Sequence, residues 1–233
     1  MLILKVISRL LDYPSQALID NSDELVDAVN ESELSADHKS QLVTFINTLT
    51  ATDLYDSQER YDLLFERGRA LSLLLFEHVH GESRDRGQAM VNLMSEYTGK
   101  GFDVASEQMP DYIPLYLEFL SEQEKSYAQE WLTDVSHILT VLSERLLDRE
   151  CDYRILFESL IELSGAAVER EKIAEAVKKE QPDDTMEAID KAWEDKEIRF
   201  DDPVQSGCES SCSGGYSAQS TPETPVTWRK AAD

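Results

Sequence analysis

Apolar residues recur at helical spacing along most of the chain. They recur every three or four positions between Leu2 and Leu11 and again between Leu42 and Leu49, as expected where one side of a helix packs against a core. No segment of the sequence has the convincing alternation of a half-buried strand. The longest regular stripe comprises Trp131, Leu132, Val135, Ile138, Leu139, Leu142 and Leu146. The pattern therefore predicts an all-α fold, a single-domain bundle of many helices.

Residues that cap or break helices mark the limits of the first segments. Pro14 breaks the first one, and Ser35 suits the N-cap position of the helix that reaches Leu49. Thr52 or Asp53 can open the next helix in the same way. The N-terminal part of the chain is therefore predicted to form successive helices joined by short loops.

The middle of the chain carries further boundaries. Ser83 can start a helix that Gly99 and Gly101 would end, because glycine adopts positive φ at little cost. After a short loop, Asp111 precedes a short helix with Pro114 in its first turn, where the missing N–H is tolerated. The sequence thus predicts a long and then a short helix between residues 83 and 120.

Three helices are predicted in the C-terminal part. Residues 121–124 have the spacing of a capping box, which predicts the start of the helix that carries the long stripe. The apolar pattern continues from Tyr153 to Leu163, and a last helix is predicted around Met186 to Trp193.

The composition changes after Asp201. Residues 202–233 are rich in Ser, Gly, Thr and Pro and hold too few apolar residues to offset the entropy of ordering. We therefore expect a helical domain over residues 1–201 and a disordered tail over 202–233. Cys208 and Cys212 lie in this tail and supply two ligands where a closed zinc site needs four, so they do not indicate a metal site.

The charge of the chain limits its partners. There are 47 acidic and 22 basic residues, a formal net charge of -25. Such a chain repels nucleic-acid phosphates and anionic lipid headgroups, so neither nucleic acid nor a bare membrane is an expected partner. The same charge would attract a basic peptide, although a merely solvated surface is the preferred interpretation.

The sequence also bears on where the protein acts. Its most apolar run, from Leu71 to Phe76, is interrupted by Ser72 and falls far short of the ~20 apolar residues that span a bilayer. The N-terminus lacks the pattern of a signal peptide. Three cysteines, an odd number, do not form the disulfide framework of a small secreted protein. We expect a cytoplasmic protein that does not insert into a membrane.

A polar cluster between Glu77 and Arg86 is the one candidate for catalytic chemistry. Glu77, His78, His80 and Glu82 are ligand types that zinc or iron would use. On a helix, however, residues two positions apart point about 200° from each other, which separates the two histidines. A charged corner held by ion pairs is therefore the preferred interpretation, and no catalytic residue or metal ligand is assigned. A metal-dependent enzyme using these four residues remains an alternative.

Two apolar segments leave their role open. Residues 71–76 and 112–119 have more apolar faces than packing on one side requires. Each is either buried all round or lines a groove that accepts an amphipathic helix from a partner.

These segments carry a resemblance to a known family. Residues 61–90, which run from Tyr61 to Met90, resemble the signature of the NarJ family of respiratory nitrate reductase assembly chaperones. Residues 7–14, 110–118 and 192–194 are similar to further segments of the family. The resemblance extends from residue 1 to about residue 200 and places the chain among the helical redox-enzyme maturation chaperones of the TorD and DmsD type.

The resemblance implies a function without turnover chemistry. Such a chaperone binds the N-terminal segment of the nitrate reductase α subunit, holds it competent for molybdenum cofactor insertion, and delays membrane docking until maturation is complete. No cofactor would be bound permanently, because the molybdenum cofactor is handled in the client. Cofactor-delivery proteins are further partners that the family suggests, and the chain would be a monomer or a domain-swapped dimer. A regulatory adaptor for another partner is a further alternative.

The resemblance also suggests which residues bind the client. An apolar groove would be lined by Leu71, Leu74, Leu75, Phe76, Tyr116 and Leu117. Acidic residues that would meet basic groups of the client are Glu77, Glu82, Asp85 and Glu118. The set is completed by His78, His80, Arg84, Pro110, Asp111 and Tyr112. Arg84 and Arg86 could instead brace the corner.

Related chaperones often carry a histidine where this chain has Tyr112. Tyrosine keeps a hydrogen-bonding hydroxyl but does not change charge near neutral pH. A proton-switched grip on the client at this position is therefore not expected.

Overall fold

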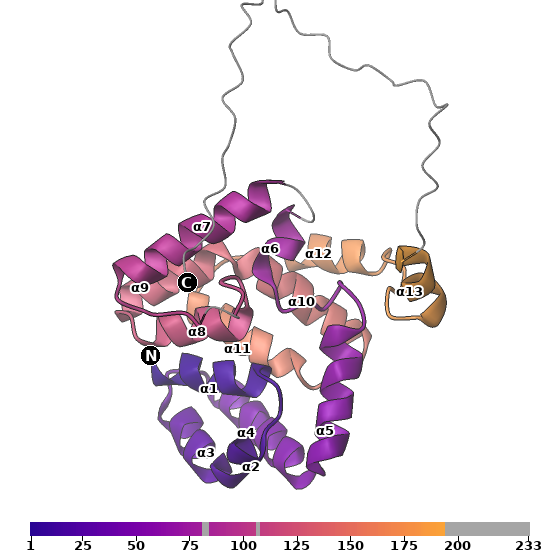
Figure 1. Ribbon diagram of the computed structural model, residues 1–233. Helices are drawn as coiled ribbons and strands as arrows, with labels where there is room; N and C mark the ends of the chain where they lie inside the picture. Colours follow the sequence, from indigo (N-terminus) through magenta and orange to yellow (C-terminus); the bar gives the residue numbers. More distant parts are fainter. Residues whose placement is uncertain (81–83, 106–107, 194–233) are drawn as a thin grey trace, which may run out of the picture. The chain divides into compact units, whose positions relative to one another are not determined.

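The computed structural model describes residues 1–80, 84–105 and 108–193 (Figure 1). Within these ranges the chain forms α-helices, one π-helical turn and a single isolated β-bridge, without a β-strand. The all-α prediction is confirmed. The helices are α1 (Leu2–Leu11), α2 (Gln16–Asp20), α3 (Ser22–Glu31), α4 (Ala36–Ala51), α5 (Leu54–Tyr61), the π turn η1 (Asp62–Glu66), α6 (Leu75–His80), α7 (Arg84–Gly99), α8 (Ile113–Ser121), α9 (Lys125–Asp134), α10 (Ser136–Asp148), α11 (Arg154–Ser164), α12 (Arg170–Val177) and α13 (Met186–Trp193).

The core lies where α1, α8, α10 and α11 meet. Helix α1 packs against α8, α3 and α11, while α10 packs against α11, α9 and α12. Side chains at the centre, such as Leu10, Phe119 and Phe157, are completely or almost completely buried. Because burying each such side chain contributes roughly 1.5–3 kcal/mol, these contacts dominate the stability of the bundle.

Several predicted helix boundaries are confirmed. The Ser35 hydroxyl accepts the His38 N–H at 3.4 Å at the start of α4, and an Asp53 carboxylate oxygen accepts the Tyr55 N–H at 2.9 Å at the start of α5. Helix α7 ends at Gly99, and Gly101 follows with φ of 75°. Capping chemistry in the sequence therefore located these ends correctly.

The prediction of one long helix over residues 121–146 is wrong. Ser121 belongs to α8, where its hydroxyl donates to the Glu118 carbonyl at 2.6 Å, and α9 begins at Lys125 without a side-chain cap. The stripe is then interrupted at Val135, which has φ of -97° and ψ of 1°. Both halves pack on α11, but α9 also packs on α8 and α10 on α12, so the interruption orients each half separately.

Three short helices, α2, α3 and α12, were not predicted. Each buries little: Val29 is the buried residue of α3 and Val177 that of α12. Leu25, Val26 and Val29 do stand at helical spacing, so α3 could have been predicted from the sequence. The predicted tail at 202–233, with Cys208 and Cys212, lies outside the described residues, as do Gly81, Glu82 and Ser83.

Hydropathy and length together rule out a membrane-spanning helix anywhere in the described ranges.

Replacing Phe157 by alanine should lower the free energy of unfolding by about 3–5 kcal/mol, because the side chain is completely buried and its loss leaves a cavity. Replacing Leu147, which is 45% exposed on α10, should change it by less than about 0.5 kcal/mol. Urea denaturation followed by circular dichroism measures both. Equal losses in the two variants would contradict the assignment of the core.

Candidate functional site

The two apolar segments identified in the sequence lie side by side in the structure. Leu74 and Tyr112 form an antiparallel β-bridge. The Leu75 N–H donates to the Asp111 carbonyl at 2.9 Å, and the Ile113 N–H donates to the Leu73 carbonyl at 2.8 Å. The start of α6 and the start of α8 are thereby fixed to each other, although nearly 40 residues separate them along the chain.

The side chain of Asp111 holds this junction together. Its carboxylate is completely buried, and Oδ2 accepts the Phe76 N–H at 3.1 Å in the first turn of α6. The same oxygen lies 3.7 Å from Nη2 of Arg86 on α7, whose Nη1 donates to Glu77 at 3.1 Å. Burial raises the pKa of Asp111, while the Phe76 N–H and Arg86 oppose this shift. Arg86 therefore braces the corner, which is the structural role that the sequence suggested as the alternative to client binding.

Four of the predicted groove residues lie in the core. Leu71, Leu75, Tyr116 and Leu117 are at most 3% exposed. The Tyr116 hydroxyl donates to the Trp131 carbonyl at 2.8 Å, which fixes its ring inside the bundle. In this conformation the four side chains are buried all round and do not line an open groove.

Leu74 and Phe76, the other two apolar residues of the predicted groove, are half-buried. The Phe76 ring lies 5.9 Å from the ring of His80 on the same helix. Asp85 is exposed on α7, and Arg84 begins that helix. The accessible part of the predicted site is therefore the surface of α6 and its neighbours.

The remaining predicted residues hold the helices around the junction. The Pro110 carbonyl accepts the Tyr97 hydroxyl at 2.8 Å. The Tyr112 hydroxyl lies 3.2 Å from Oδ1 of Asp12 at the end of α1 and 3.2 Å from the Tyr61 hydroxyl on α5. Burial raises the pKa of Tyr112, so this hydroxyl stays protonated and can donate to Asp12.

Glu118 lies apart from the other acidic residues of the predicted set. It is on α8, where it accepts a hydrogen bond from Arg9 of α1 at 3.1 Å. Glu77 therefore lies at the corner of α6 and α7, whereas Glu118 is paired with Arg9 between α8 and α1.

A cleft of about 700 Å³ lies between α6, α10 and α12. We call it the α6–α10–α12 cleft. Its lining residues are Arg69, Ala70, Glu77, His78, His137, Ile138, Val141, Arg145, Lys172, Ile173, Ala176, Val177, Glu180, Gln181 and Asp183. Two residues of the predicted site, Glu77 and His78, are among them. The apolar side chains come from α10 and α12, which the sequence analysis did not assign to the site.

His78 has a defined tautomer in this cleft. Its Nε2 lies 2.8 Å from the Ser72 carbonyl, which can only accept, so Nε2 carries the proton. Nδ1 is then an acceptor and lies 3.4 Å from Nη1 of Arg145. Burial lowers the pKa of His78, and the Arg145 charge lowers it further against the opposing Ser72 contact. His78 is therefore an uncharged wall of the cleft at neutral pH.

Arg145 fixes the wall opposite α6. Its Nε and Nη2 donate to the two carboxylate oxygens of Glu180, each at 2.7 Å, and its Nη1 donates to the Ala70 carbonyl at 2.6 Å. Such a bidentate contact is strongly directional. It holds the segment that follows α12 against α10 and against the loop before α6.

Asp183 adds a second attachment for the same segment. Its Oδ2 accepts the backbone N–H groups of Arg69 and Ala70, each at 2.7 Å. A Cβ atom at Gly68 would lie 2.7 Å from this oxygen, so any other residue there would displace the Asp183 carboxylate. Arg149 donates to Asp183 at 3.4 Å and pairs with Asp184 at 3.0 Å.

The metal alternative gains no support from the described part of the chain. There, no group of three or more His, Cys, Asp or Glu residues is placed to hold a metal ion. His78 faces Arg145 and His80 packs on Phe76, while Glu82 lies outside the described ranges.

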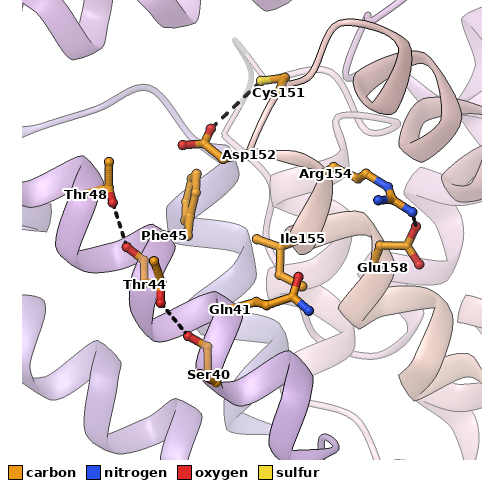
Figure 2. A pocket seen from close by; sticks show the side chains of 10 residues that line it. All are labelled: Ser40, Gln41, Thr44, Phe45, Thr48, Cys151, Asp152, Arg154, Ile155 and Glu158. Carbon is orange, nitrogen blue, oxygen red and sulfur yellow. Dashed lines mark hydrogen bonds and ion pairs between the residues drawn. The ribbon is translucent and has the colours of Figure 1, made fainter.

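Figure 2 shows a second, smaller cavity of about 340 Å³ between α4 and α11. The hydroxyls of Thr44 and Thr48 donate to carbonyls one turn earlier at 2.8 and 2.9 Å, and Arg154 pairs with Glu158 at 3.0 Å. The threonine contacts lie within α4, while Glu158 is also bound by Ser143 of α10 and Arg170 of α12. The larger and more apolar α6–α10–α12 cleft is therefore the candidate binding site.

A model of the nitrate reductase delta subunit family matches residues 31–157. The chain belongs to this family. The matched range includes α6, α8 and α10 but ends before α12, so the family match covers two of the three helices around the cleft.

Similar proteins extend this likeness over most of the chain. The nitrate reductase molybdenum cofactor assembly chaperone NarJ of Escherichia coli (strain K12) is 45% identical over 201 residues, which cover 86% of this chain and 85% of the relative. The probable assembly chaperone NarW of the same strain is 39% identical over 211 residues, covering 91% and 89%. The probable NarJ chaperone of Bacillus subtilis (strain 168) is 26% identical over 178 residues, covering 73% and 90%. All three are named as assembly chaperones and none as an enzyme.

Replacing Asp111 by alanine should lower the free energy of unfolding by about 2–3 kcal/mol, because the Phe76 N–H and the Arg86 guanidinium lose a buried acceptor. Asp111→Asn keeps an acceptor oxygen and should cost about 1 kcal/mol. Urea denaturation of both variants tests this. If alanine and asparagine cost the same, the acceptor is not what the junction needs.

The stability of the protein should depend on pH through His78. Its folded-state pKa lies below the unfolded value, so the unfolded chain binds more protons and stability falls as pH drops below about 6.5. In His78→Gln the difference in urea midpoint between pH 7.5 and pH 5.5 should be smaller than in the native chain. His137→Gln removes an exposed histidine of the same cleft and serves as control; equal reductions in both variants would refute the assignment.

Proposed function

We propose that this protein is a nitrate reductase assembly chaperone that binds the N-terminal segment of the nitrate reductase α subunit. It holds the subunit competent for molybdenum cofactor insertion and delays membrane docking until maturation is complete. The function belongs in the cytoplasm. The names of the relatives support the class of function, and the α6–α10–α12 cleft supports the mode of binding.

The observation that carries the proposal is the apolar floor of the cleft. Val141 on α10 and Ile173 on α12 are half-buried there, while Ile138 and Val177 lie below them. An amphipathic helix presents apolar side chains at positions i, i+3, i+4 and i+7, which fit a groove between two helices. The client segment would therefore lie along α10 and α12 with its apolar face inward.

The rim of the cleft would orient the client. Glu77 and Glu180 lie on it with Arg145 and Lys172, so both signs of charge are present. Glu180 is held by Arg145 and Glu77 by Arg86, which leaves these acids fixed in position before a client arrives. Fixed rim charges contribute to specificity and to the register of a bound helix more than to affinity.

The buried residues of the predicted groove have a place in this mechanism only if the junction opens. Leu71, Leu75, Tyr116 and Leu117 would become available to the client when the β-bridge between Leu74 and Tyr112 separates. We propose that the client first binds in the open cleft and that these residues contribute after such a rearrangement.

The proposed mechanism needs no turnover and no resident cofactor. A chaperone that binds only the immature client acts by mass action, and the molybdenum cofactor is handled in the client. Cofactor-delivery proteins are further proposed partners, and the chain would act as a monomer or as a domain-swapped dimer.

Replacing Ile173 by alanine should weaken client binding about fivefold to thirtyfold, because it removes roughly 1–2 kcal/mol of apolar contact from the cleft floor. The measurement is isothermal titration with a synthetic peptide that copies the first helix of the cognate α subunit. Leu74→Ala should weaken binding as well if the junction opens, with the fold checked by circular dichroism.

Leu147→Ala is the matched control, because Leu147 is exposed on α10 outside the cleft. A scrambled peptide controls for composition and separates a specific chaperone from a general adaptor. The proposal fails if the folded native chain does not bind the true peptide, or if Leu147→Ala weakens binding as much as Ile173→Ala.

A further inference from the structure

Another hollow, distinct from the two cavities described above, lies on the outward face of α5 and η1. It has a volume of about 600 Å³ and shares no lining residue with the α6–α10–α12 cleft. We call it the α5 acidic hollow. Its lining residues are Tyr13, Tyr55, Asp56, Gln58, Glu59, Asp62, Leu63, Glu66 and Arg67.

The local helix geometry explains why these residues face outward. Ser57, Tyr61 and Phe65 are buried at intervals of four residues, so the opposite side of the helix is turned to solvent. The helix continues from α5 into the π turn η1, which includes Leu63. π turns inside helices are uncommon, and those that occur often lie at functional sites.

Large apolar side chains gather in this hollow. Tyr55 is 80% exposed, Tyr13 is 46% exposed and Leu63 is 43% exposed. The Tyr13 ring lies 5.4 Å from the Tyr61 ring in an edge-to-face arrangement, so its orientation is set by a buried neighbour. Single exposed apolar residues are ordinary, but three that line one hollow indicate a contact surface.

The charges of the hollow are unbalanced. Four carboxylates, those of Asp56, Glu59, Asp62 and Glu66, face one basic residue, Arg67. None of the four has a hydrogen bond or an ion pair with its side chain in the described structure. Like charges three or four positions apart on a helix repel one another, and a cationic partner would relieve this repulsion.

The hollow between α1 and α3 has a more balanced lining. It also carries acidic residues, Glu24, Asp27 and Glu31, but Lys5 and Arg9 line it as well. The net charge of its lining is therefore close to neutral, whereas that of the α5 acidic hollow is negative.

We propose that the α5 acidic hollow is a docking surface for a basic peptide segment in which lysine or arginine alternates with aromatic or aliphatic side chains. The carboxylates would bind the cationic groups, and the two tyrosines with Leu63 would bind the apolar ones. An acidic peptide, a nucleic acid or an anionic membrane is repelled by the same four charges. This surface is separate from the proposed client cleft, and its function does not depend on that proposal.

The test uses the full chain and a dye-labelled amphipathic peptide with arginines on one face and leucine and tryptophan on the other. Fluorescence anisotropy should show saturable binding that weakens with salt. A double variant, Tyr55→Ala with Leu63→Ala, should weaken binding at least about fivefold. A charge variant that neutralises all four carboxylates should weaken it at least about tenfold; it combines Asp56→Asn, Glu59→Gln, Asp62→Asn and Glu66→Gln.

The matched charge control removes as many carboxylates from α3, as Asp23→Asn, Glu24→Gln, Asp27→Asn and Glu31→Gln. It should leave the affinity within about twofold. Ile173→Ala should also bind the probe within about twofold of the native chain; a larger loss would mean that the probe binds in the client cleft and would count against the α5 acidic hollow. The proposal is overturned if the α3 variant weakens binding as much as the α5 charge variant, or if the tyrosine and leucine replacements have no effect in chains that circular dichroism shows to be folded.

Discussion

A single buried carboxylate determines how the middle of this protein is assembled. Asp111 accepts the first free N–H of α6, faces Arg86 of α7, and precedes α8 by two residues. Burying a carboxylate is costly, and its position is tolerated because each of these contacts offsets part of the desolvation. The backbone contacts of the β-bridge between Leu74 and Tyr112 and the corner of α6 and α7 lie next to this carboxylate.

The sequence was sufficient for the fold class and for helices whose ends carry capping residues. Ser35 and Asp53 acted as expected, because capping is a local interaction between residues two or three positions apart. The break at Val135 could not be anticipated in the same way. It depends on which helices α9 and α10 pack against, and an uninterrupted apolar stripe does not contain that information.

The residues of the candidate site were harder to predict from the sequence than the helices. The sequence singled out Leu71, Leu75 and Tyr116 because they lie in strongly apolar segments, yet the strength of that signal reflects burial on all sides. Residues of the cleft floor, such as Ile173 on α12, sit in a short and mostly polar helix and give a weak signal. Arg145 was overlooked because it lies among the apolar residues of α10, and its role depends on Glu180 and His78 from distant segments.

The attachment of Glu180 and Asp183 determines when the cleft is completed during synthesis of the chain. These residues and α12 form the wall of the cleft that the ribosome makes last, after the core helices. A nascent chain that stops before α12 already contains α1 through α11 but lacks one side of the α6–α10–α12 cleft. The cleft is therefore completed only after the core helices are made, so a partly made chain does not yet have the binding site proposed for the client.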